Sequence, residues 1–126
     1  MQALVVVTTV GNEEQANLLA RELVARRHAA CVNIVGGVRS VYRWDGRICK
    51  DSEYLLVIKT RPDEYPAVEA TVRELNSYEL PEILAFQVKH GEPRFLDWIS
   101  ASLDKQAAFS DDVDEGVTIS LDDTNF

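Results

Sequence analysis

The sequence predicts an α+β fold in which a four-stranded antiparallel sheet carries two helices on one face. Strand-like and helical hydrophobic periods alternate in the order β-α-β-β-α-β, and one more helical segment follows. A single Asp-Gly turn joins the two middle strands. With 126 residues, 46% of them hydrophobic, the chain is long enough for one compact domain. These observations together indicate the ferredoxin-like plait with an added C-terminal helix.

The first strand is predicted at residues 4–10, a β-branched run that is apolar throughout, as in a strand buried on both faces. A helix follows, with Asn12 as its N-cap and with Arg26 and Arg27 at its end, where positive charge is favoured. Its predicted buried stripe consists of Ala16, Leu19, Ala20 and Leu23.

A long hairpin is predicted next. Residues 29–44 alternate like a strand, and Gly36-Gly37 interrupts them as a bulge or bend. Asp45-Gly46 forms a type I′ turn, and residues 47–60 form the return strand. A strand of about 16 residues extends roughly 50 Å, whereas the first helix covers roughly 24 Å. The hairpin should therefore extend well beyond the helices of its own chain.

The overhanging end carries Tyr42, Trp44 and several aliphatic side chains. A monomer would expose them as a large apolar surface, which soluble proteins rarely do. One interpretation is a homo-oligomer with closed cyclic symmetry. The alternative is a hairpin that folds back over its own sheet at Gly36-Gly37.

The second helix is predicted within residues 61–75. Its cap is placed near Asp63, because Pro66 is tolerated only in the first turn. The fourth strand is predicted at residues 79–88, with Pro81 at its entrance. The last helix opens at Pro93.

The charge divides the chain into a domain of residues 1–106 and an acidic tail of residues 107–126. All 13 basic residues and 15 of the 21 acidic ones precede residue 107, so the domain carries 13 − 15 = −2. Such a balance argues against nucleic-acid binding. The tail is either solvated or contributes an added edge strand through "GVTISL". The first apolar run is too short to span a membrane, and two unpaired cysteines are typical of the cytoplasm.

The segments "AACVNI", "SVYRWDGRI", "EYLLVIKT", "YELPEI" and "FLDWISASL" resemble, in order and spacing, the CutA family of divalent-cation tolerance proteins. The resemblance covers about residues 2–105. It implies a cytoplasmic homotrimer with interlocked hairpins, a link to copper and other divalent metals, and a likeness to PII-type signalling trimers. It implies no enzymatic reaction, and the sequence contains no G-x-S-x-G, H-E-x-x-H or P-loop motif.

Four residues are candidate metal ligands. Cys31 matches the family's cysteine, and a thiolate suits copper. His28 lies three residues earlier, at a position where the family usually has an aliphatic residue. Glu79 and Glu82 in "YELPE" offer two carboxylates. The alternative for Cys31 is a packing role, which is common for a free cysteine.

A second group of candidates belongs to a cleft that the family implies between subunits: Tyr42, Trp44, Lys59 and Tyr78. The segment before the fourth strand reads Asn76-Ser77 where the family usually has His-Pro, so a potential histidine ligand is absent. The main functional hypothesis is a trimer that binds or senses divalent metal, copper above all. The alternative is a PII-like regulatory trimer that binds a small anion at Lys59 and signals to a partner. Lys59 could instead form an interface ion pair with a glutamate.

Overall fold

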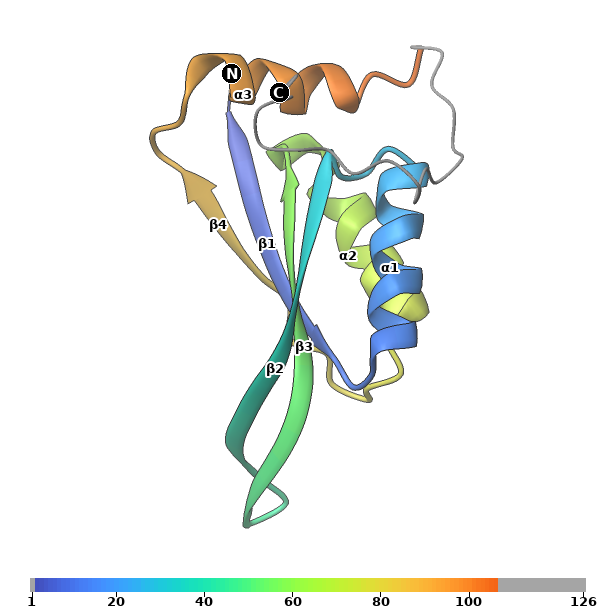
Figure 1. Ribbon diagram of the computed structural model, residues 1–126, viewed down its shortest axis with the longest axis vertical. Coiled ribbons are helices and arrows are strands. Elements are labelled where there is room, and N and C mark those ends of the chain that lie inside the picture. Colours follow the sequence, from blue (N-terminus) through green and yellow to red (C-terminus); the bar gives the residue numbers. More distant parts are fainter. Residues whose placement is uncertain (1, 107–126) are drawn as a thin grey trace.

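The computed structural model describes residues 2–106. The predicted acidic tail and its possible edge strand, residues 107–126, lie outside the described residues. Three helices, four strands and one turn of 3₁₀ helix (η1) follow one another in the predicted order (Figure 1). They are β1 (Ala3–Val10), α1 (Glu13–Ala25), β2 (Cys31–Trp44), β3 (Arg47–Thr60), η1 (Pro62–Glu64), α2 (Tyr65–Leu75), β4 (Leu84–Val88) and α3 (Pro93–Ser102).

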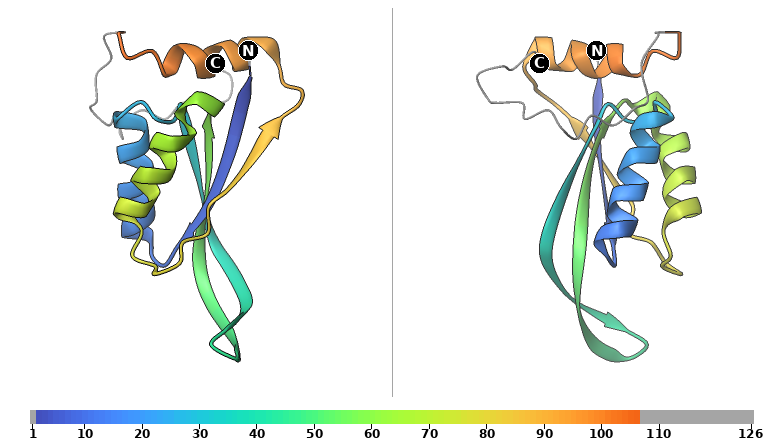
Figure 2. Two further views of the ribbon diagram at one scale, coloured as in Figure 1. Left: turned by 180° about the vertical axis from the view of Figure 1, so that it is seen from behind. Right: turned by 45° about the vertical axis from the view of Figure 1, so that its right-hand side comes forward.

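The sheet has the strand order β2-β3-β1-β4, and every neighbouring pair is antiparallel. Helices α1 and α2 lie side by side against one face of the sheet, and α3 runs across its upper end (Figures 1 and 2). This is the ferredoxin-like arrangement, so the predicted fold class is confirmed.

The main core lies between the sheet and the α1–α2 layer. The predicted stripe of α1 is confirmed there, together with even-numbered residues of β1 and β3. Its fully buried members include Val6, Leu19, Leu23, Leu56, Ile58, Val68 and Val72. A smaller cluster of Ala3, Ala30, Ile99 and Leu103 attaches α3 to the end of the sheet. The face of the sheet opposite α1 and α2 is covered by a helix only at that end (Figure 2).

The hairpin of β2 and β3 projects beyond the helices as a continuous ladder (Figure 1). Pairing runs from Cys31↔Lys59 to Trp44↔Arg47, with one irregularity between Val35 and Val38. Gly37 there has a φ of 71°, and Asp45 and Gly46 have φ values of 53° and 75°, as a type I′ turn requires. The predicted bulge, turn and overhang are confirmed, and the fold-back alternative is wrong.

The boundaries of the helices and strands follow the predicted capping and proline positions, with one correction. The Asn12 side chain accepts a hydrogen bond of 2.8 Å from the Gln15 amide, as predicted. Before α2, Pro62 begins a 3₁₀ turn, and the helix starts at Tyr65 with Glu64 as its N-cap, one residue from the predicted position near Asp63. The fourth strand is shorter than predicted. It begins at Leu84, which pairs with Val7, and residues 79–83 form a loop because Pro81 cannot donate to a ladder.

Candidate functional site

A cleft of about 600 Å³ lies between the hairpin and the loop that precedes β4. Its functional side chains come from two parts of the chain: Tyr42, Trp44 and Glu53 from the hairpin, and Tyr78, Glu79 and Glu82 from the loop. Thr9, near the end of β1, contributes to its wall. The cleft therefore forms where β1, the hairpin and the loop converge.

The loop is anchored to the end of β1 through Asn76. This buried side chain donates a hydrogen bond of 3.0 Å to the Thr9 carbonyl and accepts one of 2.9 Å from the Tyr78 amide. Gly11 leaves room for the Tyr78 ring, since a Cβ there would lie 3.2 Å from the Tyr78 hydroxyl. Asn76 thus supplies an amide that fixes the loop.

The hairpin presents its aromatic side chains on one face. Strand alternation places Tyr42 and Trp44 together, and their register partners Cys49 and Arg47 share that face. The Tyr42 hydroxyl donates a hydrogen bond to Asp51. This hydrogen bond, with smaller contributions from burial and nearby negative charge, raises the pKa of Tyr42 to about 12.

Glu53 is the most deeply buried charged group of the cleft, and its residue is only 8% exposed. Burial, followed by a hydrogen bond to Glu53, raises the pKa of Tyr78 well above its usual value. The charged lining consists of Glu53, Glu79 and Glu82, with no cationic side chain among the lining residues that the structure describes. The cleft therefore has a negative electrostatic character.

Five of the predicted site residues meet in this cleft: Tyr42, Trp44, Tyr78, Glu79 and Glu82. Sequence reasoning missed Glu53. A signal was present, because Glu53 is opposite Val38 in the register and therefore shares the hairpin face of Tyr42 and Trp44. Counting back along the hairpin from the Asp45-Gly46 turn places Glu53 on this face, so its position there was detectable from the sequence.

The other three predicted residues lie at the opposite end of the sheet. Cys31 at the start of β2 pairs with Lys59 at the end of β3. The Lys59 ammonium lies 5.8 Å from the centroid of the Phe95 ring in α3. His28 places its Nδ1 atom 3.3 Å from Oε1 of Glu64. The structure of one chain therefore separates Cys31, His28 and Lys59 from Glu79 and Glu82.

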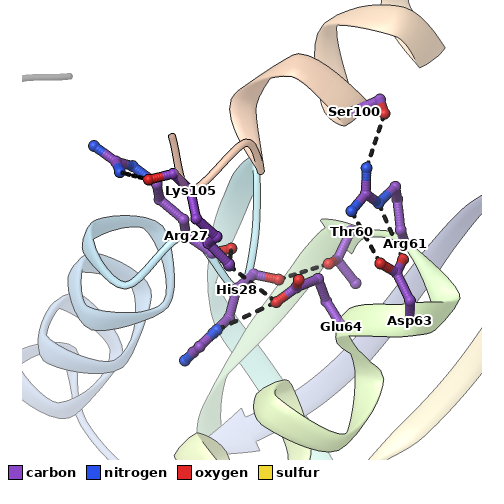
Figure 3. A network of polar contacts seen from close by, with 8 residues as sticks. All are labelled: Arg27, His28, Thr60, Arg61, Asp63, Glu64, Ser100 and Lys105. Carbon is purple, nitrogen blue, oxygen red and sulfur yellow. Dashed lines mark hydrogen bonds and ion pairs between the residues drawn. The ribbon is translucent and has the colours of Figure 1, made fainter. Parts of the chain in front are cut away.

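A polar network surrounds His28 and joins the end of α3 to the rest of the domain (Figure 3). Lys105 Nζ lies 3.1 Å from Glu64 and also donates to the Arg27 carbonyl. Nearby, Arg61 donates a hydrogen bond of 2.9 Å to the Ser100 hydroxyl. Through these contacts, His28, Glu64 and Arg61 hold the C-terminal end of α3 against the rest of the domain.

Among residues 2–106, no group of three or more His, Cys, Asp or Glu side chains is arranged to hold a metal ion. None of the helices in that range has both the length and the apolar character that crossing a membrane requires. Both cysteines in that range are free and partly buried.

Comparison with known proteins shows which family this chain is similar to. The family model described as "CutA1 divalent ion tolerance protein" matches residues 4–102. The "Divalent-cation tolerance protein CutA" of Thermus thermophilus is 44% identical over 95 residues, which is 75% of this chain and 92% of that protein. The chloroplastic "Protein CutA 1" of Oryza sativa is 40% identical over 100 residues, 79% of this chain and 56% of that longer protein.

Solved structures agree with the sequence matches. The crystal structure of CutA1 from Oryza sativa has a TM-score of 0.81 and 38% identity, covering 84% of this chain and 97% of that chain. The crystal structure of CutA from Xylella fastidiosa has a TM-score of 0.80 and 36% identity, covering 82% and 100%. The similarity thus extends over nearly all of the described residues.

Proposed function

This chain belongs to the CutA1 divalent ion tolerance family, and we propose that it works as a homotrimer that binds or senses divalent metal ions. The observation that carries the proposal is the family match over residues 4–102. The description of the family names a tolerance to ions and no reaction, so the proposal includes no catalytic role. A cytoplasmic location is part of the proposal and is supported by the two free cysteines.

The uncovered face of the sheet supports assembly. Leu4 and Val6 point into the core with α1 and α2, so Val5 and Val7 point to the other face, as do their register partners Phe86 and Leu84. Phe86 is 55% exposed and Leu84 53% exposed. Apolar surface of this kind in a soluble domain usually marks a protein–protein contact.

The charge of the hairpin supports a head-to-tail ring. One hairpin face carries Arg39, Arg43 and, opposite Val41, Lys50, while the other face borders the acidic cleft. Each copy therefore offers a basic surface and an acidic one from the same element. Contacts between unlike surfaces close into a ring when the rotation between copies permits it. A cyclic trimer satisfies this condition and also covers the exposed sheet face.

Among the candidate metal ligands, Cys31 is proposed to bind copper, since a thiolate is a soft ligand. Its register partner Lys59 is a cation, so the remaining ligands have to come from elsewhere. Glu79 and Glu82 remain candidate ligands, and they lie at the other end of the same chain. A copper site with both sets would therefore require ligands from two subunits.

The proposal is tested in two measurements on the full-length protein. Light scattering at micromolar concentration should give the mass of a trimer, and a monomer would contradict the assembly. Calorimetric titration with copper should show binding that Cys31→Ser weakens, whereas Cys49→Ser serves as the matched control because Cys49 lies near the hairpin tip. Equal copper affinity in wild type and Cys31→Ser would show that Cys31 is a packing residue and not a copper ligand.

A further inference from the structure

We infer that Asn76 is a positioning residue for assembly: its side chain holds the loop of residues 77–83 where this loop can receive the hairpin of a second copy. The inference rests on the proposed trimer for its consequence and adds a buried residue on which that trimer depends. It stands on the contacts of one side chain and on the residues that directly follow it in the chain.

Three segments of the chain meet at Asn76. Its backbone N–H donates a hydrogen bond of 2.8 Å to the Val72 carbonyl and ends α2. Its side-chain Nδ2 donates to the Thr9 carbonyl of β1 over 3.0 Å, and its Oδ1 accepts from the Tyr78 amide over 2.9 Å. Because Asn76 is buried, removing its side chain would leave the Thr9 carbonyl without this partner inside the protein, which is costly.

The loop after Asn76 has no regular secondary structure, and its other attachments are weaker or more distant. The Ser77 hydroxyl lies 3.5 Å from the Gln15 side chain, which is too far for a strong hydrogen bond. Ile83 packs against the main core, but it lies at the β4 end of the loop. The α2 end of the loop, with Tyr78, therefore depends mainly on Asn76.

Tyr78 carries this anchoring across to the hairpin. Its amide is held by Asn76, and its ring lies against Gly11, where an added Cβ would be 3.2 Å from the hydroxyl. The hydroxyl forms a hydrogen bond with Glu53 of β3, and burial together with this hydrogen bond raises the pKa of Tyr78. One buried amide thus fixes the loop relative to both β1 and the hairpin.

A loop that is already fixed favours association with a second copy. Glu79, Leu80 and Glu82 follow Tyr78 and line the cleft, and Leu80 is 70% exposed. In the proposed trimer this surface meets the basic hairpin of a neighbouring copy. Residues that are held in one position before binding lose less conformational freedom when they bind. Asn76 therefore strengthens assembly through the loop that it holds.

The first measurement is the rate at which subunits exchange between unlabelled and isotope-labelled full-length trimers, followed by native mass spectrometry. Exchange should be about tenfold faster in Asn76→Ala than in wild type, because changes at an interface act mostly on the dissociation rate. Ser77→Ala is the matched control and should exchange like wild type, since Ser77 is the exposed next residue of the same loop.

The second measurement is a pH titration of tyrosine absorbance, which separates positioning from a general loss of stability. The absorbance change that Tyr78→Phe removes identifies Tyr78. This change should move to lower pH in Asn76→Ala, because the hydroxyl is no longer held in its buried place beside Glu53. Gly11→Ala should act in the same direction with Asn76 intact, and it replaces Asn76→Ala if circular dichroism shows that the latter is misfolded.

The outcomes separate this inference from the proposed function. A wild-type trimer whose exchange rate is unchanged in Asn76→Ala would overturn the inference and leave the trimer in place. Equally fast exchange in Ser77→Ala would overturn it too, as would a Tyr78 titration that neither Asn76→Ala nor Gly11→Ala moves. A monomeric wild type in the same spectra would contradict the proposed trimer and the inference together.

Discussion

At the scale of single residues, two tyrosines hold carboxylates at the cleft. The Tyr42 hydroxyl donates to Asp51, and the Tyr78 hydroxyl donates to the buried Glu53. Both interactions favour the neutral phenol, because a phenolate beside a carboxylate would be repelled. The folded state therefore keeps protons that the unfolded chain releases at lower pH.

We predict that the free energy of unfolding falls above pH 10 as a result. Tyr42 has a pKa of about 12 in the folded protein against an ordinary value of 10. Its contribution is fully present below pH 10 and is lost as the pH rises from 10 to about 12, because the unfolded state binds fewer protons there. Urea unfolding between pH 8 and pH 11, with tyrosine absorbance as a second probe, measures this decline.

Tyr42→Phe is the control for this pH dependence. The variant should show a shallower fall in unfolding free energy above pH 10, since one of the three phenols with a raised pKa is gone. A tyrosine absorbance titration in which every phenol ionises near pH 10 would contradict the prediction.

At the scale of elements, α3 depends on a few polar contacts and one small apolar cluster. The cluster of Ala3, Ala30, Ile99 and Leu103 holds its buried side. The carboxylate of Glu64 in η1 contacts both His28 and Lys105, which follows the end of α3. His28, in the loop between α1 and β2, therefore has a structural role as the partner of a glutamate in η1.

We predict that Glu64→Gln loosens the C-terminal end of α3 while the sheet stays intact. The change removes the charge that pairs with Lys105, at a cost of about 1 kcal/mol or less because Lys105 is partly exposed. Hydrogen exchange should accelerate by up to about fivefold at the amides of Leu103 and Asp104, which close the last turn.

Asp63→Asn is the comparison variant for α3. Asp63 is exposed and pairs only with Arg61, whose hydrogen bond to Ser100 does not require it. Exchange at Leu103 should therefore change less than in Glu64→Gln. Equal exchange rates in wild type and Glu64→Gln would show that the apolar cluster alone holds α3.

At the scale of the whole molecule, the sheet has one face buried under helices and one face largely open. The hairpin extends past both layers (Figure 1). A single chain thus leaves Leu84, Phe86 and Trp44 about half exposed. The architecture is complete as a fold but leaves a surface that assembly would cover.

We predict that Phe86→Glu lowers the assembly mass in light scattering, because a charge on the open face would be buried without a partner in the proposed trimer. Leu18→Glu is the matched control, since Leu18 is similarly exposed, at 48%, but lies on α1. Loss of assembly in both variants, or in neither, would contradict the assignment of the interface to the open face.

The sequence by itself determined the type and order of the elements, because the signals involved are local. Asn12 caps α1 through an amide three residues away, and Asp45-Gly46 turns the hairpin through its own backbone angles. Periodicity identified the buried face of α1 for the same reason. The length of the hairpin and its overhang followed from the rise per residue alone.

Only the tertiary structure decided which distant residues share a site. Glu53 meets Tyr78 in the cleft because the loop before β4 comes back to the hairpin, where Asn76 ties it to Thr9 at the end of β1. The same geometry takes Cys31 and Lys59 to the other end of the sheet. Loop anchoring and the approach of the loop to the hairpin depend on contacts between segments far apart in the chain, which no local pattern encodes.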